Sequence, residues 1–357
     1  MTAQHARRVI RACVVTLLLG ASAIRAAGTP TLPTGRVGPY SGITSAADAR
    51  SMLADGLTLA IITAPARDVV AALREGGAKY IDTRLWNLVF AVCQRQFGAQ
   101  TAARQSLACS ISAADEDLIA EQAAAYLRTV EQEPTLAGLW ILDDYPHGDI
   151  TGVLHRLHAL VHESNVRSGF ERPTVCGVGG SLDYKRNADD AAFIQDHGYM
   201  DEALRNVFPS DCDLVSPYFY ASAGADDPRL IDWSMKDLFP YFQQALQAKR
   251  YDTSAHVLLP IAHAFSAHVT GSTSYYVTPR PDDIAAQMDA YCTGGASSIM
   301  FFTWRAADTD RSYSTDASLR AGVQRGRMSC TQLWHDRSKL PHDEIHIERG
   351  RVRPGSE

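Results

Sequence analysis

Residues 136–144, LAGLWILDD, decide the fold, because they form an apolar run that ends abruptly in two carboxylates. Pro134 ends an amphipathic stretch just before this run, and another amphipathic stretch begins near Ile150. A short apolar run between two helix-like segments is typical of a strand buried in a parallel sheet. Side chains just beyond the carboxyl ends of such strands usually form the functional site. The two aspartates therefore indicate where chemistry would occur.

The rhythm of apolar run, turn and amphipathic stretch repeats along the chain. Such alternation predicts a parallel sheet covered by helices. Eight units fit an α/β fold of the (β/α)8 TIM-barrel type, with an open doubly wound sheet as the alternative. The predicted strands are residues 35–42, 57–63, 78–85, 136–144, 174–180, 213–220, 256–265 and 297–304.

The first 27 residues have the features of a secretory signal peptide. Three arginines precede an uncharged stretch at 12–24, and small residues follow it. The apolar core is short for a membrane span, which needs about 20 residues. An uncleaved anchor is the alternative. No later run has spanning length, so we expect a secreted or periplasmic protein without stable membrane insertion after signal cleavage. The predicted parts are the signal at 1–27, a barrel at 28–335 and a polar tail at 336–357.

Charge and cysteine content narrow the class of protein further. Removing residues 1–27, which hold four arginines and no acid, takes the net charge from −6 to −10. An acidic chain argues against a nucleic-acid partner. Six of the seven cysteines lie beyond the signal, and an even number in an exported chain is compatible with three disulfides. Six cysteines can pair in 15 ways. Cys93–Cys109 is the preferred disulfide, because the two cysteines flank one loop, whereas Cys176–Cys212 and Cys292–Cys330 are weaker choices.

The carboxylates at strand ends are the candidate catalytic residues. Asp144 is the preferred general acid, Asp143 would orient it or bind a hydroxyl, and Asp82 is the leading second carboxylate. Adjacent residues of a regular strand point to opposite faces, so Asp144 shares a direction with Trp140 and Asp143 does not, unless the strand has ended or bulged. Alternatively, one aspartate caps the next turn and the other pairs with an arginine, and Asp82 forms a salt bridge with Arg84.

Aromatic and polar side chains at other strand ends are candidates for substrate binding. Tyr218 and Tyr220 share a face, and Trp304 would offer a ring on which a sugar stacks. His263 and Arg84 complete the candidate set. Simple packing is the alternative for the aromatic residues, and a structural role is the alternative for His263.

Metal and cofactor chemistry have weak support in the sequence. His147 and Asp149 lie near Asp144 without HxxxH or HExxH spacing. Residues 177–180, GVGG, lack the spacing of a dinucleotide-binding loop. No metal site and no cofactor are therefore predicted.

Residues 137–146, AGLWILDDYP, resemble the DGxDxDxEYP signature of the family 18, chitinase-like glycoside hydrolases. The ending of the last strand at Trp304 and the segment Ser216-Pro217-Tyr218 are also similar to that family. The resemblance implies a glycoside-hydrolase-like barrel with its acid at Asp144. Leu142 stands where the family has the aspartate that supports substrate-assisted catalysis, so chitinase activity is not implied.

These features predict an exported glycoside hydrolase acting on a poly- or oligosaccharide by carboxylate general acid/base catalysis. Two alternatives stay open. One is a carbohydrate-binding barrel without catalysis. The other is a barrel hydrolase or lyase with a non-sugar substrate, with or without a metal at Asp143, Asp144 and His147. The sequence does not indicate the oligomeric state.

Overall fold

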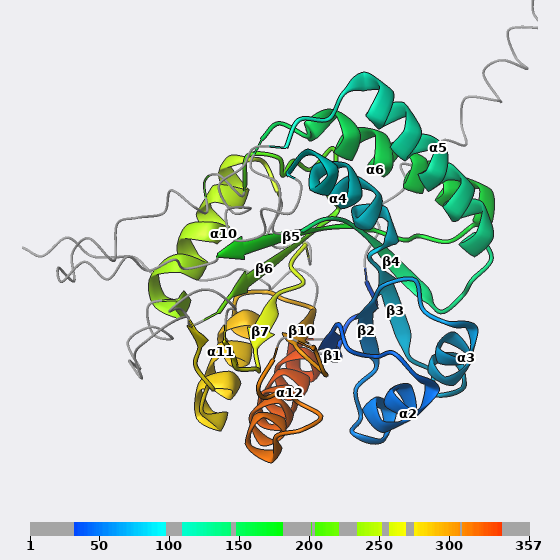
Figure 1. Ribbon diagram of the computed structural model, residues 1–357. Helices are drawn as coiled ribbons and strands as arrows, with labels where there is room; N and C mark the ends of the chain where they lie inside the picture. The colour runs from blue at the N-terminus through cyan, green and yellow to red at the C-terminus, as the bar shows by residue number, and fades with distance from the viewer. Residues whose placement is uncertain are drawn as a thin grey trace, which may run out of the picture. The chain divides into compact units, whose positions relative to one another are not determined.

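Within the described residues, eight parallel strands close into a barrel in the order β1-β10-β7-β6-β5-β4-β3-β2 (Figure 1). The computed structural model describes residues 32–97, 109–143, 148–180, 201, 204–220, 234–251, 257–268, 275–307 and 309–337. Closure is made by β1 and β10, which pair over five residues from Arg36↔Ser298 to Tyr40↔Phe302. This pairing excludes the open doubly wound sheet, and the predicted (β/α)8 TIM barrel is confirmed.

All eight predicted runs contain a barrel strand. The run at 174–180 coincides with β5, and the other seven runs extend beyond their strands by one or more residues. The barrel strands are β1 (Arg36–Tyr40), β2 (Leu59–Ile62), β3 (Lys79–Asp82), β4 (Leu136–Leu142), β5 (Thr174–Gly180), β6 (Leu214–Phe219), β7 (Ile261–His263) and β10 (Ser298–Phe302). A separate antiparallel pair follows β7, formed by β8 (Ala267–His268) and β9 (Tyr275–Tyr276).

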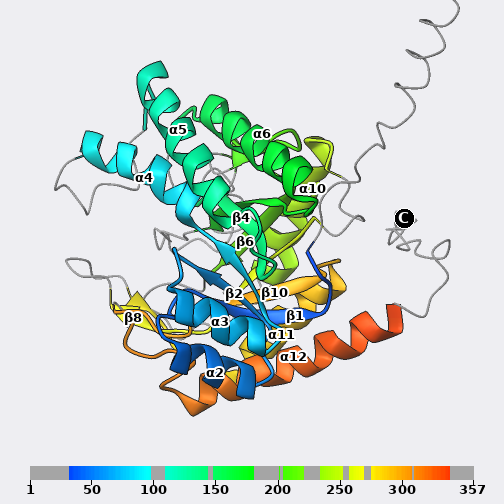
Figure 2. The ribbon, with the colours of Figure 1, turned by 90° about the vertical axis from the view of Figure 1, so that its right-hand side faces the viewer.

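Helices surround the strands, as the alternating pattern predicts. In Figure 2, α5 and α6 lie side by side, and they are in contact along their lengths. The described helices are α2 (Ala46–Ala54), α3 (Arg67–Glu75), α4 (Arg84–Phe97), α5 (Ala113–Val130), α6 (Thr151–Ser168), the π-helix η3 (Ser234–Leu238), α10 (Phe239–Ala248), α11 (Pro281–Thr293) and α12 (Ala317–Arg337).

Local sequence signals explain where several helices begin. Ser112 caps α5 by accepting a hydrogen bond from the amide of Asp115 at 3.1 Å. Pro240 falls in the first turn of α10, directly after η3, since a proline is tolerated only where no helical amide is needed. Helix α4 corrects the prediction from the sequence, in which this segment is an irregular connection. Its apolar face packs on β4.

Three disulfides join neighbouring elements, and they are the three pairs preferred from the sequence. Cys93 of α4 is bonded to Cys109, Cys176 of β5 to Cys212, and Cys292 of α11 to Cys330 of α12. Their Cα atoms lie 5.4, 5.7 and 5.6 Å apart, within the ordinary range for a disulfide. Disulfides of this kind persist in oxidising compartments.

The predicted signal peptide at 1–27 lies outside the described residues, as does most of the predicted tail from 338 onward. Helix α12 runs to Arg337, slightly beyond the predicted start of the tail at 336. Among the helices that the structure describes, none combines the length and apolarity required to cross a bilayer.

We expect Gly38→Ala to destabilise the barrel strongly. A methyl group added at Gly38 would lie 1.4 Å from the carbonyl oxygen of Leu59, so β1 and β2 would have to separate. The free energy of unfolding in urea should fall by about 3 kcal/mol or more, the upper range for an overpacked core. Gly152→Ala on α6 is the matched control, because its added methyl would meet only the flexible end of Glu116 at 3.3 Å. Equal stability of the two variants would contradict the predicted close packing at Gly38.

Candidate functional site

The carboxylate of Asp143 lies inside the barrel, at the carboxyl end of β4. It accepts hydrogen bonds from the hydroxyl of Tyr40 at the end of β1 and, at 2.7 Å, from that of Tyr218 on β6. Neither β1 nor β6 is a neighbour of β4 in the barrel. Side chains from strands that are not adjacent can meet only across the interior, so Asp143 points inward.

A β-bulge in β4 explains this orientation. Trp140 pairs with Val175, but Leu142 pairs with Cys176, so two steps along β4 match one step along β5. The extra residue reverses the alternation of side chains beyond it. Asp143 therefore joins Trp140 in the interior, where the Trp140 ring meets Tyr40 edge-on at 5.4 Å. Regular alternation, in which Asp143 would face away from Trp140, does not hold here, because the strand has bulged, which is the exception that the sequence leaves open.

Gly177 of β5 provides the space that this arrangement needs. A methyl group there would lie 2.5 Å from Cζ2 of Trp140 and 3.2 Å from Oδ1 of Asp143. A side chain at this position would displace the indole and then the carboxylate. The glycine-rich run at 177–180 thus has a packing function next to Asp143.

Aromatic rings surround Asp143 at the carboxyl ends of the strands. Tyr218 stacks on Tyr220 at 5.5 Å, and Phe302 lies 5.7 Å from Tyr40 and 5.9 Å from Tyr220. Tyr40, Asp143, Tyr220 and Phe302 are partly exposed, so this group reaches the surface. We refer to it as the carboxyl-end cluster, which consists of Tyr40, Trp140, Asp143, Tyr218, Tyr220, His263, Phe265, Tyr276 and Phe302.

His263 belongs to the cluster as a buried, uncharged histidine. Its side chain is 2% exposed, and its ring lies 4.7 Å from that of Phe265 and 5.6 Å from that of Tyr220. Burial lowers the pKa of His263 to about 4, although the hydrogen bond to the carbonyl of Phe265 opposes this shift. Because Nε2 lies 2.9 Å from that carbonyl, Nε2 carries the proton. Nδ1 is then an acceptor, and it has no hydrogen-bond partner among the described residues.

Asp82 lies outside the cluster, between β3 and the helix layer. It is 1% exposed, and Oδ2 accepts a hydrogen bond from the hydroxyl of Tyr126 on α5 at 2.5 Å. Oδ1 accepts from the backbone amides of Ala64 and Arg84. Burial raises the pKa of Asp82, against the opposing effect of these hydrogen bonds. The surroundings of Asp82 are those of a buried structural carboxylate.

Arg84 and Trp304 also lie outside the cluster as described. The Arg84 guanidinium is 5.4 Å from the centre of the Tyr126 ring. Trp304 is 4% exposed, stacks on Tyr313 at 5.2 Å and donates from Nε1 to Asp48 at 3.2 Å. Strand β10 ends at Phe302, and it is this ring that occupies the position expected for Trp304.

Two predicted residues, Asp144 and His147, fall outside the described residues, so their geometry stays a prediction. The structure brings together Asp143, Tyr218, Tyr220 and His263 from the predicted set. Sequence reasoning missed Tyr40, although it is the last residue of the first strand. It also missed Phe302, two residues before the tryptophan that drew attention.

Comparison with known proteins supports the fold. No protein-family model matches the sequence, and no curated protein matches it. The endo-β-1,4-mannanase from Thermotoga petrophila aligns with a TM-score of 0.52 at 11% identity, covering 88% of this chain and 79% of that one. The endo-1,4-β-mannanase from Rhizomucor miehei aligns with a TM-score of 0.50 at 12% identity, and the alignment covers 85% of this chain and 98% of that one. A glycoside hydrolase family 18 N-acetylglucosaminidase from Paenibacillus barengoltzii aligns with a lower TM-score of 0.44 at 12% identity, and the alignment covers 84% of this chain and 99% of that one.

At these identities the likeness concerns the fold. The chain has the (β/α)8 barrel fold that the sequence predicts, and its fold is similar to that of the two mannanases. The candidate active site lies at the carboxyl ends of its strands. There, Asp143 accepts hydrogen bonds from two tyrosines within a group of aromatic rings.

We expect Tyr126→Phe to destabilise the protein in a pH-dependent way. Removing the hydroxyl leaves the buried Asp82 carboxylate with one donor fewer, so its folded-state pKa, already raised, rises further. A group with a raised folded-state pKa loses stability as the pH rises from its unfolded value, near 3.9, through its folded value. The free energy of unfolding of the variant should be lower than that of the wild type by about 1–3 kcal/mol at pH 7 and by less at pH 4. Urea unfolding at the two pH values measures this difference.

The control for this experiment is Tyr126→Phe in an Asp82→Asn background. An amide does not ionise, so the effect of the tyrosine substitution should there be the same at both pH values. An equally large pH dependence in that background would show that Asp82 is not its origin.

Proposed function

We propose that this chain is an exported glycoside hydrolase in which Asp144 is the general acid and Asp143 is its partner. The observation that supports this most directly is the inward position of Asp143, held by tyrosine hydroxyls from two different strands. Asp144 is the next residue in the chain and corresponds to the acid of the family 18 signature. The three disulfides support export to an oxidising compartment.

The chemistry of the cluster suits a sugar substrate. Hydrolysis of a glycosidic bond needs one carboxylic acid to protonate the leaving oxygen and usually a second carboxylate that attacks or activates water. Both oxygens of Asp143 accept a hydrogen bond from a tyrosine hydroxyl, as the oxygens of an ionised carboxylate do. The partly exposed rings of Tyr220 and Phe302 offer apolar faces to a pyranose.

Asp143 is a better partner for Asp144 than Asp82. Asp82 is 1% exposed and accepts its hydrogen bonds from Tyr126 of the helix layer and from two backbone amides, so it has no access to the aromatic cluster. Asp143 instead contacts residues at the ends of β1 and β6, where the aromatic rings converge. We therefore assign the second carboxylate to Asp143 and a structural role to Asp82.

A second candidate function is carbohydrate binding without catalysis. It is favoured by the composition of the carboxyl-end cluster, in which Asp143 is the one carboxylate among the residues that the structure describes, whereas aromatic rings are many. Such a barrel would bind a glycan through Tyr220 and Phe302 and leave it intact.

The proposed function is tested by measuring reducing ends released from a panel of polysaccharides, including β-1,4-mannan and chitin. Asp143→Asn and Asp144→Asn should each lower kcat on the responsive glycan by about 100-fold or more, since general acid/base catalysis contributes that much. Asp82→Asn is the matched control and should keep most of the activity. Unfolding curves of all three variants exclude loss of structure as the cause.

Two results would contradict the assignment. Full activity in Asp143→Asn or in Asp144→Asn would exclude that residue from catalysis. Glycan binding by the wild-type protein without any product, lost in Phe302→Ala or Tyr220→Ala, would establish the binding function instead.

A further inference from the structure

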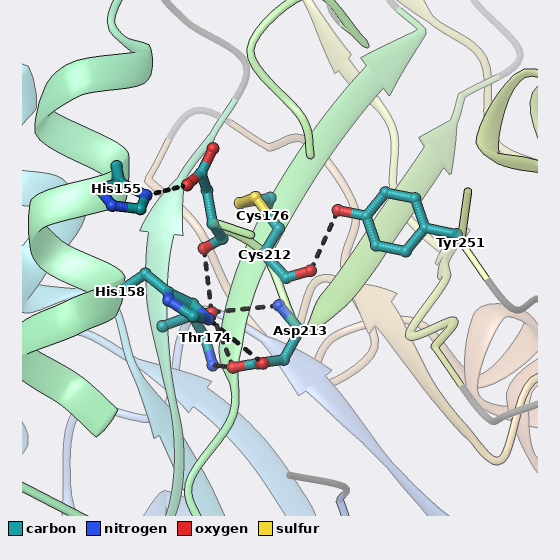
Figure 3. The surroundings of a disulfide bond; sticks show 8 residues. His155, His158, Thr174, Cys176, Cys212, Asp213 and Tyr251 are labelled. Carbon is teal, nitrogen blue, oxygen red and sulfur yellow. Dashed lines mark hydrogen bonds and ion pairs between the residues drawn. A yellow bond between two sulfur atoms is a disulfide. The ribbon is translucent and has the colours of Figure 1, made fainter. Parts of the chain in front are cut away.

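A cluster of histidines and aspartates lies at the amino end of β6, away from the carboxyl-end cluster. Helix α6 carries His155, His158 and His162 on one face, as their spacing of three and four residues requires. His155 faces Asp211, and His158 and His162 face Asp213, the two aspartates lying on either side of Cys212. Figure 3 shows His155, His158 and Asp213 around the disulfide. Asp213 directly precedes β6, whereas Tyr218 lies near the other end of the same strand.

Two of the imidazoles converge on one carboxylate. Nε2 of His158 is 3.4 Å from Oδ1 of Asp213, and Nε2 of His162 is 3.1 Å from Oδ2. The two rings lie 4.1 Å apart, tilted by 30°. The two nitrogens and the carboxylate oxygen all lie within 4.8 Å of one another. Three potential ligand atoms therefore surround one point.

The carboxylate is held in place by its own neighbours. Oδ2 of Asp213 accepts from the amide of Thr174 at 2.8 Å and from its hydroxyl at 2.9 Å. The Cys176–Cys212 disulfide fixes the backbone next to it, and Tyr251 donates to the carbonyl of Cys212 at 3.0 Å (Figure 3). Hydrogen bonds of this kind orient the carboxylate ligands of metal sites. Oδ1, by contrast, is turned toward His158.

The spacing of these atoms matches tetrahedral coordination. Ligand atoms that lie 2.0–2.1 Å from a tetrahedral Zn²⁺ are about 3.4 Å from one another. The distance of 3.4 Å between Nε2 of His158 and Oδ1 of Asp213 agrees with this value, and Nε2 of His162 lies 3.1 Å from the other oxygen, Oδ2. Imidazole nitrogen together with one carboxylate is a donor set that zinc takes readily. The side chains of His158 and His162 are 16% and 36% exposed, so an ion can reach them from solvent.

Ion pairing with Asp213 balances the charge of one protonated histidine, and the second imidazole shares the same carboxylate. If both histidines were protonated, two like charges would face each other at a ring separation of 4.1 Å. If both histidines are neutral, each imidazole has one N–H donor and one nitrogen lone pair that need partners. A divalent cation accepts the lone pairs of both rings and the charge of the carboxylate together.

We propose that Nε2 of His158, Nε2 of His162 and Oδ1 of Asp213 form a binding site for a divalent transition-metal ion, with zinc as the preferred ion. The ion would connect α6 to the start of β6 and to Thr174 at the start of β5. Because the amino ends of barrel strands serve stability and the carboxyl ends serve catalysis, the site stabilises the barrel and takes no part in chemistry at Asp143.

The test is calorimetric titration of ZnCl2 into the tag-free chain after treatment with EDTA. We expect one zinc ion per chain with a Kd below about 10 μM, together with a higher Tm in excess zinc. His158→Gln and His162→Gln should each weaken binding by about tenfold or more. His155→Gln is the matched control, because His155 lies on the same helix face but pairs with Asp211 at 2.9 Å. Its affinity for zinc should equal that of the wild type.

Three results would overturn the proposal. They are the absence of zinc binding to the wild-type chain, undiminished binding in the His158→Gln/His162→Gln double variant, and calcium binding as tight as zinc binding. Melting curves of each variant in EDTA establish that it is folded, so lost binding reports on the ligands.

Discussion

The pairing of β1 with β10 is the interaction on which the rest of the structure depends. It joins residues 36–40 to residues 298–302 and converts a twisted sheet into a closed barrel. Without it, Tyr40 would lie at a free sheet edge, far from Asp143. With it, Tyr40 lies next to Phe302 and reaches across the interior to the end of β4. The carboxyl-end cluster is therefore a consequence of closure, since its members come from strands that only a barrel brings face to face.

Most of the architecture could be predicted from the sequence, because each barrel strand is an apolar run with a helix-like segment beside it. The Cys93–Cys109 disulfide could also be selected, since its cysteines flank one loop, whereas Cys176–Cys212 and Cys292–Cys330 were weaker choices that the structure also forms. Helix α4 was not recognised, because it begins only two residues after β3 and its first residues, Arg84 and Leu85, lie within the run predicted as a strand. Chain pattern thus predicts the order of elements better than it predicts a helix that follows a strand so closely.

The site was predicted less completely, for reasons that are local. The inward position of Asp143 depends on a bulge between Trp140 and Leu142, and alternation along a strand cannot anticipate an extra residue. Trp304 lies beyond the end of β10, so its ring packs on Tyr313 although it has the same parity as Phe302. Asp82 has the parity of Tyr80 and faces the helix layer, where Tyr126 meets it. Strand ends, where chemistry occurs, are where the pattern is least informative.

The closing pair of strands also governs how the chain can fold. The amide of Arg36 contacts the hydroxyl of Ser298 across 262 positions of sequence. As the polypeptide leaves the ribosome, the outer edge of β1 has no partner until residue 302 has emerged, so nearly the whole barrel must be synthesised first. An unpaired strand edge invites association with other chains during that interval. Contacts of such long range also make the final step slow. Maturation of this protein therefore favours conditions that keep nascent chains apart until their last strand arrives.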